Sequence, residues 1–168
     1  MPISMSQASA PRFAHMLKSL SAILAKAQAH CEARKIDPLV LTSSRLYPDM
    51  FPLSRQVQIA CDSAKGAVAR LSGVEAPKHE DSEQTFEELQ ARIRKTLDFI
   101  ASVKPAQIDG SEDKEIVLKL RGKDVSFKGV QYLQGFAFGN FYFHVTTAYN
   151  ILRHNGVELG KSDFLGGN

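Results

Sequence analysis

Four long stretches of the chain repeat apolar residues at spacings of three and four, as on one face of an α-helix. They cover residues 9–34, 52–71, 82–103 and 130–153. Gly73 follows the second stretch closely, and glycine commonly ends a helix because it adopts left-handed backbone angles readily. The pattern therefore predicts four amphipathic helices.

The segments between these stretches carry turn and cap residues. Residues 35–52 contain three prolines, which predicts a connecting loop of some length. Ser82 precedes an acidic first turn, so the third helix is expected to begin there. Asn155 and Gly156 are expected to cap the last helix, and the glycine-rich tail after them to wrap back on the surface.

Between residues 115 and 128 the apolar residues recur at every second position instead of every 3.6 positions, with a glycine-containing turn in the middle. This pattern predicts a β-hairpin. An isolated hairpin is marginal in water, so it should lie against the helices or pair with a second chain. The fold class expected is all-α, a four-helix bundle with a small β-hairpin inserted before the last helix, and residues 1–168 are expected to form a single domain.

Charge and composition exclude several classes of partner. The net charge of +3 comes from 21 basic and 18 acidic residues scattered along the chain, so no nucleic acid is expected to bind. No apolar run of about 18 residues predicts a membrane span, and the start has no signal-peptide pattern, which favours a cytoplasmic protein. Cys31 and Cys61 have no metal or redox spacing and are interpreted as reduced core thiols.

The last helix contains one polar constellation. Asn140, His144 and Thr147 have the spacing i, i+4, i+7 and share a face with apolar residues, so they should point into the bundle. A buried imidazole is either a hydrogen-bonded structural group or a ligand, and both interpretations stay open here, with the structural one favoured. The chain has no GxSxG, P-loop or GxGxxG motif, and catalytic residues stay unknown.

The same helix is rich in aromatic residues, which cover more than one of its sides: Phe136, Phe138, Phe141, Tyr142 and Phe143. They indicate a helix buried nearly all round, a ligand pocket or a dimer interface. Together with the hairpin, they predict a homodimer.

Two segments carry a resemblance to a known family: LYPDMFPLSRQVQIACDSAKGAVARLSG and GFAFGNFYFHVTTAYNILRHNGVELGKSDFLG. Together they resemble an uncharacterised bacterial domain-of-unknown-function family related to the DinB/YfiT-like metalloenzyme bundles, over nearly the whole chain. The resemblance implies a four-helix bundle that is often dimeric. It also implies, for many relatives, a divalent metal held by one histidine on the second helix and an HxxxH pair on the last. Some relatives are thiol-dependent transferases or isomerases.

The family motif places His144 at the second histidine of the last helix and Asn140 at the first, with a second-helix ligand between Gln58 and Asp62. A ligand pocket of Asn140, His144, Thr147 and Gln58 is therefore predicted, and a weak metal set of His144, Asn140 and Asp62. Zinc and nickel prefer imidazole or thiolate, so no tightly held cofactor is expected.

Two functions follow as hypotheses. The favoured one is a non-catalytic or ligand-binding homodimeric bundle of unknown role, with a polar pocket around the last helix and no reaction that the sequence assigns. The alternative is a divergent metal-dependent enzyme of the DinB/YfiT type, a thiol transferase or hydrolase-like protein with a loosely bound zinc or nickel ion.

Overall fold

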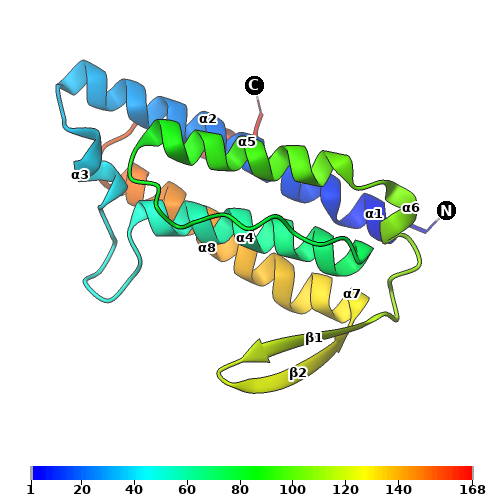
Figure 1. Cartoon of the computed structure of the whole chain (residues 1–168). Helices are drawn as coiled ribbons and strands as arrows, with labels where there is room; N and C mark the ends of the chain where they lie inside the picture. Colours follow the sequence, from blue (N-terminus) through cyan, green and yellow to red (C-terminus); the bar gives the residue numbers. More distant parts are fainter. Residues whose placement is uncertain (1, 168) are drawn as a thin grey trace.

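The computed structural model describes residues 2–167 and contains four long helices that lie side by side (Figure 1). These are α2 (Ala10–Arg34), α4 (Leu53–Ser72), α5 (Phe86–Ser102) and α8 (Phe138–His154). Strands β1 (Glu115–Leu120) and β2 (Lys123–Lys128) precede the last helix. The predicted four-helix bundle with an inserted hairpin is confirmed.

Short helical turns occupy the connections. They are α1 (Met5–Ala8), α3 (Pro38–Thr42), α6 (Pro105–Ile108), α7 (Gly129–Gln131) and α9 (Lys161–Leu165). The tail folds back as predicted, because α9 lies on α2, where Asp163 forms an ion pair of 2.6 Å with Lys26. Within residues 2–167, no helix combines the length and the apolar character needed to cross a bilayer.

Most helix ends lie close to their predicted positions, and α5 is the exception. Thr85, not Ser82, caps it: the Thr85 hydroxyl accepts from the Glu88 amide at 3.2 Å, and the Glu88 carboxylate accepts from the Thr85 amide at 3.0 Å. The predicted start at Ser82 is wrong because this reciprocal capping box satisfies two free amides, whereas Ser82 stands before residues that do not continue as helix.

Helix α4 is the centre of the bundle and packs mainly against α8 and α5. Its inner face is made of small residues, and Ala60, Ala64 and Ala67 are fully buried. Small side chains let neighbouring helix backbones approach closely. The two free thiols, Cys31 and Cys61, are buried in the same core.

The aromatic residues of the last helix divide between core and surface. Phe141 is fully buried and meets Phe13 of α2 edge to face at a centroid distance of 5.0 Å, whereas Phe143 is 57% exposed. The hairpin lies against the bundle, since Phe127 of β2 packs on Phe136 at 5.9 Å. The last helix thus contributes aromatic rings to the core, to the hairpin contact and to the surface.

Between α7 and α8 the helix widens into a π-helix, η1 (Tyr132–Ala137). The sequence pattern did not predict this change. Such wide turns are rare, and they occur frequently at functional sites. The η1 turn places Tyr132 and Phe136 beside α4 and begins the surface described next.

Candidate functional site

Two polar pairs join α4 to α8. The Asn140 amide donates to the Ser63 hydroxyl at 2.9 Å, and His144 Nδ1 lies 2.7 Å from Gln56 Oε1. The pairing order shows that the two helices run antiparallel at this point. Asn140 and His144, at i and i+4, occupy one face of α8, as the sequence predicts.

His144 is held in one orientation by Gln56. The Gln56 side-chain amide donates to the Phe51 carbonyl at 3.0 Å, so its oxygen is the atom that faces the imidazole. An amide oxygen only accepts, and His144 Nδ1 therefore carries the ring proton while Nε2 keeps its lone pair. Burial and the positive charge of Arg55 lower the pKa of His144, so the ring is neutral at pH 7.

Next to the Asn140–Ser63 pair, a hollow of about 200 Å³ opens between α4 and the η1 turn. We call it the α4–η1 groove. Its lining combines apolar, hydrogen-bonding and charged side chains: Ile59, Asp62, Ser63, Arg70, Tyr132, Phe136, Ala137 and Asn140. Its lining thus combines apolar contact with a few polar groups, as ligand sites do, although its volume is small.

A three-ligand metal site does not fit this arrangement. Within residues 2–167, no group of three or more histidine, cysteine, aspartate or glutamate side chains is placed to hold an ion. His144 faces the amide of Gln56, and Asn140 is bonded to Ser63. One imidazole with neutral amide and hydroxyl groups is a poor donor set for zinc or nickel.

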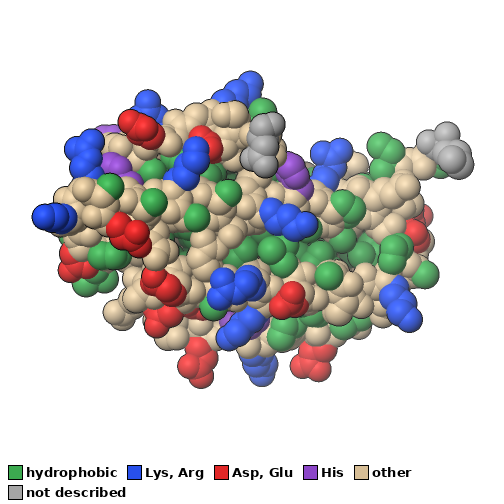
Figure 2. All heavy atoms as spheres, turned by 90° about the horizontal axis from the view of Figure 1, so that it is seen from above, with side chains coloured by type: hydrophobic (Ala, Val, Ile, Leu, Met, Phe, Trp, Pro, Cys, Tyr) green, Lys and Arg blue, Asp and Glu red, His purple; other side chains and the backbone are tan. Residues whose placement is uncertain are grey.

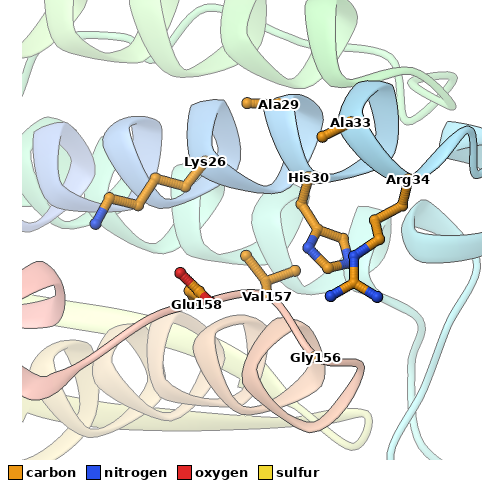
Figure 3. Close-up of a pocket in the computed structure, with 8 residues that line it drawn as sticks. All are labelled: Lys26, Ala29, His30, Ala33, Arg34, Gly156, Val157 and Glu158. Atoms are coloured by element: carbon orange, nitrogen blue, oxygen red, sulfur yellow. The ribbon is translucent and has the colours of Figure 1, made fainter.

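Another hollow, of about 400 Å³, lies between α2 and the segment after α8. Figure 3 shows the side chains of His30 and Arg34 pointing into it opposite Gly156. It contains none of the residues predicted for the site, so it is separate from the α4–η1 groove.

A family model described as a domain of unknown function, DUF1993, matches residues 5–165. The chain belongs to the DUF1993 family. Among solved structures, this DUF1993 chain is similar to the crystal structure of a DinB family member protein from Shewanella denitrificans at 1.83 Å resolution. The two are 45% identical, with a TM-score of 0.87, over 97% of this chain and 92% of the other. No curated protein matches it significantly. The predicted relation to DinB-like bundles is confirmed.

The remaining predicted site residues of the DUF1993 chain form their hydrogen bonds and ion pairs with groups other than His144. Thr147 is buried but donates to the Phe143 carbonyl of its own helix at 2.7 Å. Gln58 donates to the Glu83 carboxylate at 3.0 Å on the opposite side of α4. The residue of α4 beside His144 is Gln56, whereas the family motif predicts one between Gln58 and Asp62. Gln56 precedes the buried Ala60 by four residues and so lies on the same inward face of α4, and this spacing could have identified Gln56.

Asp62 belongs to a charged network around Arg92, which is only 2% exposed. The Arg92 guanidinium binds Asp62 at 2.9 Å, Asp81 at 3.0 Å and Glu83 at 3.0 Å. Lys65 holds the other oxygen of Asp62 at 3.0 Å. This network fastens the segment before α5 to α4, and it explains why neither Gln58 nor Asp62 joins the groove's hydrogen-bonded pairs.

We predict that Arg92→Ala lowers the free energy of unfolding by about 3 kcal/mol, because it removes the buried cation that Asp62, Asp81 and Glu83 share. This loss of stability is at the lower end of the range for breaking a buried ion pair, because the Asp62 and Asp81 side chains are about two-fifths exposed and can be hydrated. Urea unfolding followed by circular dichroism measures the change. Arg94→Ala, at an exposed position of the same helix, is the control and should stay within about 0.5 kcal/mol of wild type. Equal effects of the two substitutions would contradict a special role of Arg92.

Proposed function

We propose that this DUF1993 domain is a ligand-binding bundle whose site is the α4–η1 groove, and that it acts without a tightly bound metal. The observation that carries the proposal is the meeting of the Asn140–Ser63 pair with the η1 turn in one hollow. Polar groups that converge in a partly apolar pocket fix the orientation of a small molecule.

The groove can both donate and accept hydrogen bonds. Asn140 uses one amide hydrogen on Ser63, so its second hydrogen and its oxygen are free, and the Ser63 hydroxyl has a hydrogen of its own to donate. Ile59 and Phe136 supply apolar contact. The volume of about 200 Å³ is below the range of drug-sized pockets, which favours a compact ligand.

The alternative of a divergent metal-dependent enzyme depends on His144. Its favourable feature is that Gln56 holds Nδ1 and leaves Nε2 free, as the outer partners of metal-binding histidines do. Among the residues that the structure describes, however, no two further histidine, cysteine, aspartate or glutamate side chains join His144 to hold an ion. We therefore favour the binding function and assign no reaction.

A screen of small polar compounds by amide NMR tests the groove. Shifts are expected to map to residues around Ser63, Phe136 and Asn140. Ser63→Leu fills the groove with a larger apolar side chain and should abolish these shifts, whereas Ser54→Leu, on the same helix but outside the groove, should retain them. Melting curves of both variants confirm that they fold. Binding that maps to the hollow near His30 instead, or that survives Ser63→Leu, would refute the assignment.

We also propose that the chain forms a homodimer through its α2–α5 face. Figure 2 shows apolar side chains gathered on this face of the molecule. A hollow of about 480 Å³ there is lined by small and apolar residues with one cation and one anion: Ala10, Pro11, Ala14, Lys18, Leu97, Asp98, Ile100, Ala101 and Val103. In a two-fold dimer the same patch meets itself, so Lys18 of one copy can pair with Asp98 of the other.

Light scattering after size exclusion should give twice the 18.5 kDa mass of one chain at micromolar concentration. Lys18→Glu places like charges together and should weaken the dimer at least about tenfold. The double variant Lys18→Glu, Asp98→Lys restores the complementarity and should restore the dimer. A wild-type mass of one chain, or a double variant as weak as the single one, would count against this interface.

A further inference from the structure

Arg70 stands in the α4–η1 groove without an acidic partner. Its Nη1 donates to the Tyr132 hydroxyl at 3.0 Å, and its guanidinium carbon lies 5.8 Å from the centre of the Tyr132 ring. Among residues 2–167, no carboxylate lies within ion-pairing distance of this side chain, whereas Arg55 and Arg92 both have such partners. The groove therefore contains a positive charge that no carboxylate in the described part of the chain neutralises.

Two features fix where this charge lies. Tyr132 is only 1% exposed and belongs to the η1 turn, so the hydroxyl that binds Arg70 has a defined position. Gly66 lies one helical turn before Arg70, and a Cβ atom there would come within 2.5 Å of Nη1. The guanidinium thus occupies space that only a glycine at position 66 leaves open. The bond to Tyr132 orients the guanidinium toward the groove, so part of its rotamer entropy is lost before an anion binds.

The acid that shares the groove does not cancel this charge. Asp62 also lines the hollow, but its two oxygens are held by Arg92 at 2.9 Å and by Lys65 at 3.0 Å. Its negative charge is therefore balanced on the side of α4 that faces α5. The charge that remains available to a ligand in the groove is that of Arg70.

We propose that the ligand is a small organic acid whose carboxylate binds Arg70. Nη1 is engaged by Tyr132, and the Nε and Nη2 hydrogens can bind the two oxygens of a carboxylate side by side. The body of the acid then contacts Ile59 and Phe136, and its polar atoms reach the Asn140–Ser63 pair. This inference rests on the proposed binding function and adds the chemical class of the ligand.

Benzoate and its neutral counterpart benzamide test the charge, with amide NMR titrations on the whole chain. Benzoate should shift the groove residues and bind at least about tenfold more tightly than benzamide, because a hydrogen-bonded ion pair is stronger than its neutral equivalent. Arg70→Met should remove that advantage and leave benzamide binding unchanged. Gly66→Ala keeps the cation but displaces it, and should weaken benzoate as well. Arg94→Met, on exposed α5 surface, is the matched control and should bind benzoate as the wild type does.

Inorganic phosphate is the third probe. It should bind more weakly than benzoate, because it cannot use the apolar contacts; phosphate binding as tight as benzoate would refute an organic acid. Equal binding of benzoate and benzamide in the groove would overturn the carboxylate inference and leave the proposed binding function intact. Benzoate binding that survives Arg70→Met would overturn it too. The absence of groove shifts with all three probes would count against both the inference and the site.

Discussion

The close approach of α8 to α4 is the constraint on which the rest of the structure depends. Fully buried alanines on α4 bring the two helices near enough for side chains to hydrogen-bond across the interface. A polar group in such an interior must find a partner or destabilise the fold by roughly 1–3 kcal/mol. Gln56 satisfies His144, and Ser63 satisfies Asn140. The widened η1 turn then leaves one hollow beside this interface, and the unpaired donors and acceptors gather there.

The fold could be predicted well because helix periodicity and cap residues are local signals. Gly73 ends α4 with a φ of 79°, as its position after the apolar stripe indicates. The start of α5 was misplaced because Ser82 and Thr85 are both good caps, and only the reciprocal bonds of Glu88 distinguish them. The η1 turn has no residue signature of its own, so no pattern could have predicted it.

From the sequence, the site could be predicted only for residues that lie on the same helix. The spacing of Asn140 and His144 correctly places both on one face, because that follows from helix geometry alone. Their partners depend on how α4 is rotated and shifted against α8, which is a tertiary property. Gln56 and Gln58 are about 200° apart around α4. An error of two residues in aligning α4 with α8 therefore replaces the residue that faces His144 with one that faces Glu83. The burial of Arg92 could not be predicted for the same reason, because its counterions come from α4 and from the segment before α5.

We propose that hydrogen bonds within the chain, rather than a metal ion, satisfy the polar groups at the α4–α8 interface. The most direct measurement is elemental analysis of protein purified without a metal-affinity tag or chelator. Zinc and nickel are expected well below one ion per chain, and the His144→Ala variant is expected to be less stable by about 1–3 kcal/mol because Gln56 loses its donor. One ion per chain that disappears in His144→Ala without a change in melting temperature would contradict the account.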